Sequence, residues 1–322
     1  MLNNIKKKLR IDFDKNTKIS FYLRGLWIVF SPKFLYCKNL EEKYNNLDSE
    51  IKKKIDNRIN YYNKVETDFF LSSKAKTIRE FINKEKRKTY FFDLLEYLKY
   101  FDFSKKISYI FGDVIEVPET PSIVKSRPIL KDNNNSVLMK LNKVRHFIFV
   151  NDQQKYEDKI DKVVWRGKCY RKHRKLFVQN FYDSSLCNIG QVNTKGEINV
   201  PWQKEKLSLH EQLNYKFLIA IEGNDVASNL KWAMSSNSLV MMAKPKYETW
   251  FMEGTLRANI DYVLLKDDYS DLEEKIKYFL EHTEKAKTII SKSNEYVKQF
   301  KNTEYEDIIS YKVLEKFFKD SK

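Results

Sequence analysis

The densest cluster of basic side chains follows a short apolar run at 162–165. It opens with Arg166-Gly167, and glycine lets a backbone approach a ligand closely. Guanidinium groups bind phosphate oxygens in pairs, and the N-terminus of a following helix adds positive charge. The cluster could therefore neutralise a diphosphate, although a solvated basic helix face has the same composition. Its charged or titratable members are Arg166, Lys168, Arg171, Lys172, His173, Arg174 and Lys175.

A small polar turn at 222–225 separates an apolar run at 217–221 from a helical pattern that starts at Val226. A strand, a tight turn and a helix start place free backbone N–H groups where a phosphate can sit. Many such units bind nothing, so the pattern alone leaves both interpretations open. Ser228 and Asn229 either contact a ligand or cap the helix, and Lys231 is a further cation. The acidic residues of the turn, Glu222 and Asp225, are suited to ribose or sugar hydroxyls.

Carboxylates stand after two other predicted strands. Asp113 follows a strand at 107–111, and the pair Asp267-Asp268 follows a strand at 262–265. Paired carboxylates can hold Mg²⁺ on a diphosphate. The helical pattern from Leu272 instead favours a lead-in to a helix, with Ser270 or Asp271 as the N-cap. We therefore expect no metal site and no cofactor.

The composition indicates a folded protein with a strong positive charge. The 322 residues are 42% hydrophobic and carry a net charge of +16, spread along the chain. Such a charge attracts nucleic acid, an anionic membrane or a phosphorylated substrate. Because no helix-turn-helix, ribonucleoprotein motif or zinc finger is present, we expect an anionic membrane surface or glycolipid and no nucleic acid.

The sequence contains no run of about 18 apolar residues and no convincing signal peptide. The cysteines Cys37, Cys169 and Cys187 are widely spaced, which indicates a reducing compartment. We therefore expect a cytoplasmic protein that binds a membrane surface peripherally. The aromatic segment at 17–37 is either an interfacial amphipathic element or a buried element of the first domain.

The order of elements divides the chain near its middle. Residues 40–100 carry helical periodicity, and a proline-containing loop follows the strand at 107–111. The apolar letters HFIFV at 146–150 predict a strand, and the charged segment 151–162 is a candidate boundary. Beyond it, strands alternate with helices, which predicts an α/β domain with a parallel, doubly wound sheet.

The chain resembles glycosyltransferase family 90, in particular its lipopolysaccharide-modifying branch. The family also contains protein O-glucosyltransferases and fungal capsule-associated xylosyltransferases. The resemblance is carried by EGNDVASNLKWAMSSNSLVMM, KPKYETWFMEG and DYVLLKDDYSDLEEKI, by VVWRGKCYRKHR upstream, and more weakly by FGDVIEVPETPSIVKSRPI. It covers roughly the last two-thirds of the chain.

The resemblance implies a GT-B-like architecture, in which two Rossmann-like domains face a cleft beside a helical N-terminal region. Residues 1–155 would form the acceptor-side domain and residues 156–322 the nucleotide-sugar-binding domain, with the last helix a candidate to pack back on the first domain.

The resemblance also implies roles for individual residues. Asp113 would be the general base, with Glu116 as the fallback on a loop whose proline spacing departs from that of eukaryotic relatives. Asn229 stands where those relatives often have arginine. The expected donor-binding residues are Arg166, Gly167, Lys168, Arg174, Gly223, Asn224, Asp225, Val226, Ala227, Ser228, Asn229 and Lys231. The expected acceptor-binding residues are Glu116, Lys125 and Arg127.

Together with these patterns, the resemblance implies an inverting, metal-independent glycosyltransferase that is peripheral to the inner membrane. It would use a UDP-sugar and a lipopolysaccharide or lipooligosaccharide acceptor. The alternative is a non-catalytic basic protein that binds membrane or nucleic acid. That alternative explains the charge but not the ordered motifs.

Overall fold

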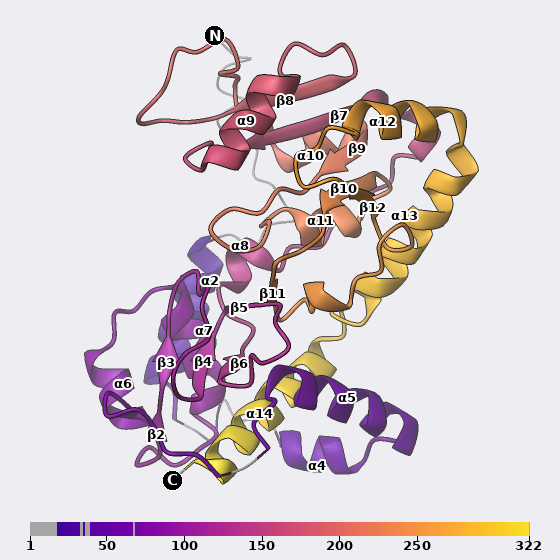
Figure 1. Cartoon of the computed structure of the whole chain (residues 1–322). Helices are drawn as coiled ribbons and strands as arrows, with labels where there is room; N and C mark the ends of the chain where they lie inside the picture. Colours follow the sequence, from indigo (N-terminus) through magenta and orange to yellow (C-terminus); the bar gives the residue numbers. More distant parts are fainter. Residues whose placement is uncertain (1–17, 33–34, 36–38, 67, 322) are drawn as a thin grey trace.

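The computed structural model describes residues 18–32, 35, 39–66 and 68–321. Figure 1 shows an elongated molecule in which two parts lie one above the other. The upper part contains a five-stranded sheet with its helices, and the lower part contains a small three-stranded sheet surrounded by helices. The chain is thus a mixed α/β protein, as the sequence predicted.

All strands of the larger sheet are parallel, in the order β12-β10-β9-β7-β8. The chain enters the sheet at β7, continues to the neighbouring edge strand β8, and then crosses back past β7 to β9 in the middle of the sheet. The winding direction therefore reverses between β7 and β9, and sheets of this order bind ligands beyond the carboxyl ends of the strands at the reversal. The strands are β7 (Ile160–Gly167), β8 (Cys187–Gln191), β9 (Tyr215–Ile219), β10 (Leu239–Ala243) and β12 (Val263–Leu265).

Both faces of this sheet are buried. Phe217 and Ile219 of β9 pack in one hydrophobic cluster, and Leu218 between them packs in the other. A strand that is buried on both faces has a continuous apolar sequence, and β9 could therefore be predicted from the sequence. The helices of this part are α9 (Lys172–Phe181), α10 (Leu209–Leu213), α11 (Leu230–Met234), α12 (Leu272–Glu281) and α13 (Thr283–Lys298), and two 3₁₀ turns are η1 (Tyr156–Asp158) and η2 (Glu253–Thr255).

The lower part is less regular than the second Rossmann-like domain that the sequence predicted. Its parallel sheet has the order β3-β4-β6, with strands of only two or three residues, and β1 pairs with β2 in a separate antiparallel ladder. Its strands are β1 (Lys76–Thr77), β2 (Lys106–Ile107), β3 (Tyr109–Ile110), β4 (Ser122–Val124), β5 (Ser126–Pro128) and β6 (Ser136–Leu138). Its helices are α2 (Lys18–Phe30), α4 (Leu40–Asn45), α5 (Ser49–Tyr62), α6 (Ile78–Lys84), α7 (Thr89–Leu98) and α8 (Lys143–His146).

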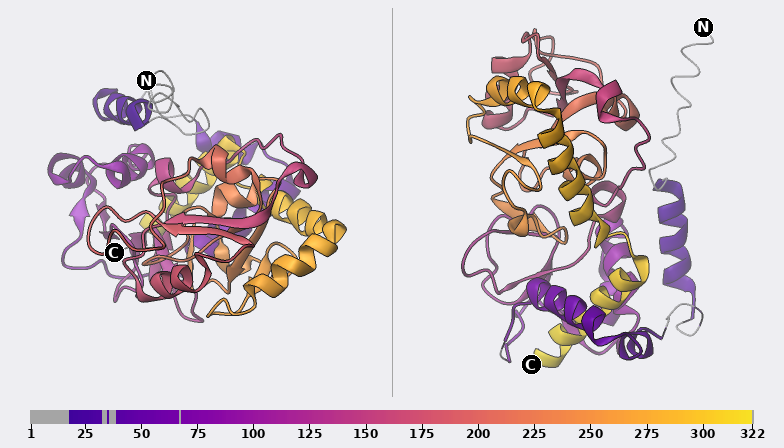
Figure 2. Two further views of the ribbon diagram at one scale, coloured as in Figure 1. Left: turned by 90° about the horizontal axis from the view of Figure 1, so that it is seen from above. Right: turned by 90° about the vertical axis from the view of Figure 1, so that its right-hand side faces the viewer.

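The two parts are joined in two places. The C-terminal helix α14 (Thr303–Asp320) leaves the upper part and packs against α4, α5 and α7 of the lower part, as Figures 1 and 2 show. Strand β5 of the lower part pairs antiparallel with β11 (Tyr247–Thr249), which lies in the chain between β10 and β12 of the large sheet. The positions of the strand ends in the two parts are therefore fixed relative to one another.

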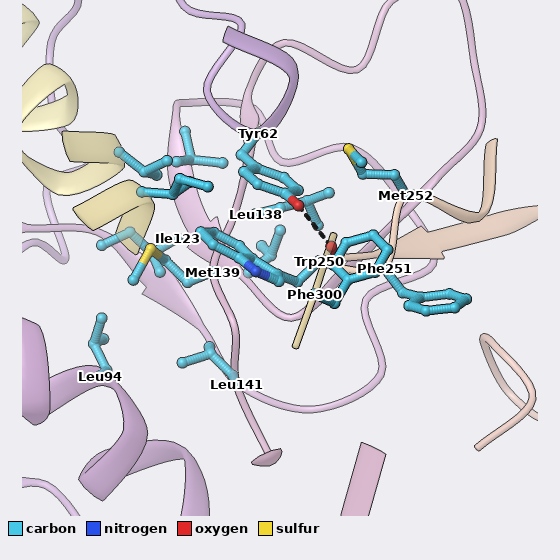
Figure 3. Close-up of a cluster of buried hydrophobic side chains, with 14 of the residues drawn as sticks. Tyr62, Leu94, Ile123, Leu138, Met139, Leu141, Trp250, Phe251, Met252 and Phe300 are labelled. Carbon is cyan, nitrogen blue, oxygen red and sulfur yellow. Dashed lines mark hydrogen bonds between the residues drawn. The ribbon is translucent and has the colours of Figure 1, made fainter. Parts of the chain in front are cut away.

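A shared hydrophobic core reinforces this junction (Figure 3). The rings of Tyr62 and Trp250 stack with centroids 3.8 Å apart, and the Tyr62 hydroxyl donates to the Trp250 carbonyl at 2.8 Å. Trp250 in turn donates from Nε1 to Glu306 at 2.8 Å, and Arg58 pairs with the same carboxylate at 2.6 Å. Residues from α5, α14 and the segment after β11 thus share one buried network.

One predicted strand is not formed. Of residues 146–150, His146 ends the short helix α8 and the rest follow without regular structure. The three phenylalanine and isoleucine side chains, Phe147, Ile148 and Phe149, still pack against the core. Burial, and not strand pairing, accounts for this apolar run.

Candidate functional site

The loop after β7 and the turn after β9 meet where the winding of the sheet reverses. Arg174, in the first turn of α9, donates from Nε to the carbonyl of Glu222 at 2.8 Å and from Nη2 to that of Ile221 at 2.6 Å. Its Nη1 reaches the Lys168 carbonyl at 3.3 Å. One partly buried guanidinium therefore holds both segments together, and α9 directs its positive N-terminal end toward them.

The turn after β9 also reaches the lower part. Asn224 accepts a hydrogen bond from Arg171 Nε at 2.6 Å and donates one from Nδ2 to Asp113 at 3.0 Å. Asp113 lies in the loop after β3, so this contact crosses from one part of the molecule to the other. Gly223 keeps the turn close to α9, because a Cβ there would stand 3.2 Å from Arg174 Nη2.

Lys125 links two carboxylates from different parts of the molecule. Its Nζ lies 2.6 Å from Asp113 Oδ1 and 2.6 Å from Asp225 Oδ2, and its side chain is 2% exposed. The contact with Asp225 has the distance of an ion pair but not the angles of a hydrogen bond, so this Oδ2 accepts no hydrogen bond from the described residues. Asp113 is more open, with 31% of its side chain exposed.

The environment of Asp113 keeps it ionised. Partial burial opposes ionisation, but the hydrogen bond and charge of Lys125 outweigh it, helped by Asn224, and lower the pKa of Asp113. A carboxylate that is charged and partly exposed can accept a proton from a bound hydroxyl group, which is the requirement for a general base.

Asp113 faces a cavity of about 250 Å³ that we call the basic cavity. Four cations and two carboxylates line it, so it is suited to an anion next to a proton acceptor. Its polar and charged lining residues are Asp113, Arg145, His146, Lys168, Tyr170, Arg171, Arg174, Asn224, Asp225 and Ser228.

A second cavity of about 390 Å³, the larger cavity, adjoins it. The two cavities share Arg171, Gly223, Asn224 and Val226 in their linings. The larger cavity has an apolar side formed by Ala220, Ala227, Leu230 and Met242, and a polar side that includes Glu222, Glu253, Tyr247 and Tyr269. An apolar surface with a few polar groups is typical of a site for a planar organic group.

Glu222 stands out among the residues of the larger cavity. Its Oε1 accepts hydrogen bonds from the backbone N–H groups of Lys246 at 3.0 Å and Tyr247 at 3.2 Å. Burial outweighs these contacts and raises the pKa of Glu222 to about 7. Near neutral pH the protonated form is therefore populated, and it can both donate to and accept from a hydroxyl group.

The structure brings most of the predicted donor residues to these cavities. Lys168, Arg174, Asp225 and Ser228 line the basic cavity, and Ala227 lines the larger one. Gly223, Asn224 and Val226 line both.

Arg166 is not among them. Neighbouring residues of a strand point to opposite faces, and Trp165 points to α9, where it contacts Phe177 and Arg174. The Arg166 guanidinium lies on the other face and donates to the carbonyls of Glu205 at 2.9 Å and Asn188 at 2.7 Å. The resemblance thus identified one arginine of the cavity, Arg174, and one outside it, Arg166.

Three other predicted donor residues do not line either cavity and make structural contacts instead. Gly167 leaves room for Trp165, because a Cβ would stand 2.3 Å from its ring. Asn229 donates to the Ile219 carbonyl at 3.0 Å. Lys231 is buried in an ion pair with Glu253, so its charge is already balanced.

The helix start predicted after the polar turn lies later than expected. Helix α11 begins only at Leu230, after buried turn residues at 225–227. Its N-terminal amides are therefore not at the turn. The positive charge of the site comes from side chains and from the N-terminus of α9.

The predicted acceptor residues occupy three different positions. Lys125 belongs to the site through Asp113. Glu116 is exposed on the loop beyond Asp113. Arg127 is fully buried and pairs with Glu248 at 2.7 Å while donating to the carbonyls of Tyr61 and Ser136. Arg127 links β5 to β11 and to α5, and its buried guanidinium cannot reach an acceptor substrate.

Sequence reasoning missed Arg145, His146 and Tyr170 as lining residues of the basic cavity. Arg145 and His146 lie in α8, and His146 is the first of the residues 146–150 that predicted a strand. A strand places alternate side chains on opposite faces, so that interpretation hid an adjacent pair that shares one cavity. Arg171 was recognised as part of the basic cluster but not as a member of the site.

Comparisons with known proteins agree with this geometry. The sequence model described as Glycosyl transferase family 90 matches residues 135–319. The chain is 39% identical over 304 residues to the O-glucosyltransferase LpsA of Dichelobacter nodosus, which covers 94% of this chain and 95% of that protein. Protein O-glucosyltransferase 2 of Danio rerio is 31% identical over 140 residues, covering 42% of this chain and 28% of that protein.

Proposed function

The chain belongs to glycosyltransferase family 90 and is a glycosyltransferase, and from this premise we propose that it transfers a sugar from a UDP-sugar to lipopolysaccharide or lipooligosaccharide with inversion. The observation that carries the proposal is the basic cavity. It places the carboxylate of Asp113 opposite the cations Lys168, Arg171 and Arg174, at the winding reversal of a parallel sheet.

The two cavities match the parts of such a donor. The nucleoside would occupy the larger cavity, where apolar side chains can contact a uracil ring and Glu222 a ribose hydroxyl. The diphosphate would lie at the residues shared by both cavities, beside Arg171 and the N-terminus of α9. The sugar would then reach the basic cavity next to Asp113.

The reaction follows from this placement. Asp113 accepts the proton of the acceptor hydroxyl group, and the oxygen of that hydroxyl group forms a bond to the anomeric carbon. The bond from that carbon to the diphosphate breaks, and UDP leaves with the electron pair. Negative charge develops on the departing oxygen, and Arg174 and its neighbouring cations stabilise it. Attack on the face opposite the leaving group inverts the anomeric configuration.

The arrangement supports a GT-B-like organisation. The proposed donor contacts come from the upper part and Asp113 comes from the lower part, and residues of both parts line the basic cavity. Glucose is the first sugar to test, because two relatives carry the name O-glucosyltransferase. We propose residues 1–155 as the acceptor side and 156–322 as the donor side, with α14 packed on the former.

Transfer is predicted to be independent of divalent metal. Asp267 pairs with Lys246 at 3.2 Å, and Asp268 accepts from the Ser270 N–H at 3.0 Å, while Asp271 accepts from Lys266 and not from its own helix. The cations of the basic cavity would supply the charge that Mg²⁺ supplies elsewhere. Turnover should therefore persist in excess EDTA. Loss of turnover with EDTA and its recovery with Mg²⁺ or Mn²⁺ would contradict this.

Contact with an anionic membrane is proposed through α2. Its residues Phe21, Gly25 and Ile28 face the molecule, where a Cβ on Gly25 would collide with Phe92. The opposite face exposes apolar side chains at helical spacing, from Ile19 (73% exposed) through Leu23 and Trp27 to Phe30 (74%). Figure 2 shows α2 on the outside of the molecule. The net charge of +16 favours an anionic surface over a neutral one.

Helix α2 is too short to cross a bilayer. Its 13 residues span about 20 Å, against a hydrocarbon core of roughly 30 Å. Across the described residues, no helix has the length and apolar character of a membrane span. The apolar stripe is therefore suited to lie along the surface, as an interfacial helix does.

Leu23→Gln is expected to weaken binding to anionic phospholipid vesicles by about tenfold, because burying a leucine is worth roughly 1.5–3 kcal/mol. The matched control is Leu130→Gln, which changes a similarly exposed leucine outside α2. Wild-type binding should fall as salt rises. The proposal would be contradicted if the two variants bound anionic vesicles equally well. It would also be contradicted if the wild type bound neutral and anionic vesicles equally well at low salt.

The proposed function and its alternative differ in what they bind. A UDP-sugar-dependent enzyme should bind UDP by calorimetry and slowly hydrolyse its donor without acceptor. A non-catalytic basic protein should instead bind nucleic acid with a steep salt dependence and show no saturable UDP site. Tight nucleic-acid binding with no detectable UDP binding would reject the proposed function.

A further inference from the structure

His146 has no hydrogen-bond partner in the part of the chain that the structure describes. It is the last residue of α8, is 2% exposed, and lines the basic cavity. Neither Nδ1 nor Nε2 makes a hydrogen bond with a described residue. Leaving a buried polar group unsatisfied costs about 1–3 kcal/mol, so such a group beside a cavity points to a ligand that completes it.

The surroundings of His146 keep its imidazole neutral. Burial is the largest cause, and the charges of Lys231, Lys125 and Arg145 add to it, so the pKa of His146 lies well below its usual range. A neutral imidazole has one nitrogen that donates and one that accepts. Any group that satisfies both nitrogens must therefore supply an acceptor and a donor.

This requirement distinguishes the parts of the donor. A phosphate oxygen only accepts, and Arg174, Arg171 and Lys168 already offer charged donors to it. A sugar hydroxyl both donates and accepts, and a sugar carries several of them. His146 also lines the same cavity as Asp113, and the transferred sugar must sit beside Asp113 for the acceptor to attack it.

We propose that His146 hydrogen-bonds a hydroxyl group of the transferred sugar and is a residue that selects the donor sugar. This inference rests on the proposed function, because it needs a sugar nucleotide in the basic cavity. A pocket group that pairs with a hydroxyl rejects a sugar that lacks it or carries it in the other orientation, since the buried ring is then left unpaired.

The test combines variants of His146 with altered donors. The full-length wild type, His146→Ala and His146→Gln are assayed for transfer from the preferred UDP-sugar and from its monodeoxy analogues. His146→Ala should lower kcat/KM for the complete donor about three- to tenfold, the usual value of one hydrogen bond. For the deoxy analogue that lacks the hydroxyl group contacted by His146, His146→Ala should leave kcat/KM unchanged. The hydrogen bond to that hydroxyl group is already absent in this case. His146→Gln should recover part of the loss, since its amide also donates and accepts.

Two controls separate this role from others. UDP lacks the sugar, so its calorimetric affinity should be the same in the wild type and in both variants. His210→Ala changes an exposed histidine outside the cavity and should leave transfer unchanged. Unfolding transitions of the variants check that the fold is retained.

Two results would overturn the inference. One is a loss on His146→Ala that is equal for every deoxy analogue, and the other is a matching loss of UDP affinity, which would make His146 a phosphate ligand. Both results leave the proposed function standing. A wild type that neither binds nor turns over any UDP-sugar would instead reject the proposed function, and this inference with it.

Discussion

Asp113→Asn is expected to lower sugar transfer by about 10²–10⁴-fold, the usual contribution of a positioned general base. The substitution keeps the size of the side chain, removes its ability to take up a proton, and removes one of the two negative charges that contact Lys125. Lys125 remains paired with the buried Asp225, so the local structure should persist. Affinity for UDP, measured by calorimetry, should stay near that of the wild type, because the donor contacts come from the other part of the molecule.

Glu116→Gln is the matched control for this substitution. Glu116 is exposed on the same loop, and it does not line the cavities that contain the donor residues. Its loss should leave transfer within a few-fold of the wild type. If Glu116→Gln abolished transfer and Asp113→Asn did not, Glu116 would be the base. Normal transfer by both variants would place the base outside this loop.

Arg174→Ala should weaken UDP binding by about ten- to a hundredfold or more, since one charge-assisted hydrogen bond is worth roughly 1.5–3 kcal/mol. Its guanidinium holds the turn after β9 to the loop after β7, so the variant loses both a charge and the alignment of the cavity wall. Arg174→Lys should recover only part of the affinity, because an ammonium group cannot make the same forked contacts.

Arg166→Ala provides the control for charge. It removes the same positive charge eight residues earlier in the sequence, from a guanidinium that lies on the opposite face of the sheet. UDP affinity should change by less than about twofold, the size of a screened surface effect. An equal loss in both variants would mean that net charge governs binding. Unchanged affinity in Arg174→Ala would remove Arg174 from the donor site.

The large sheet could be predicted because its strands are buried on both faces. Runs such as 217–221 and 238–242 are apolar without alternation, and polar turns bound them, so their type and order were evident in the sequence. The loops at their carboxyl ends follow from that order. The basic residues after β7 and the turn after β9 were therefore placed correctly before their contacts were known.

The side-chain contacts could not be predicted in the same way. Arg127 and Lys231 are of residue types that often bind anionic ligands, yet each is buried in an ion pair with a glutamate. Arg127 pairs with Glu248, and Lys231 pairs with Glu253. Only the fold reveals such partners. The assignment of Arg166 depended on its orientation on the strand, which a one-residue difference reverses. His146 was missed because it was interpreted as the first residue of a strand at 146–150.

The central claim is that the basic cavity transfers a sugar from UDP to a lipooligosaccharide. The most direct measurement incubates the purified protein with lipooligosaccharide and, in turn, UDP-glucose, UDP-galactose, UDP-xylose and UDP-N-acetylglucosamine, and follows the acceptor by mass spectrometry. We predict that one donor adds the mass of a single sugar and releases UDP, that NMR shows the inverted anomeric configuration, and that Asp113→Asn suppresses the product. Retention of configuration, or the same yield from Asp113→Asn, would contradict this account.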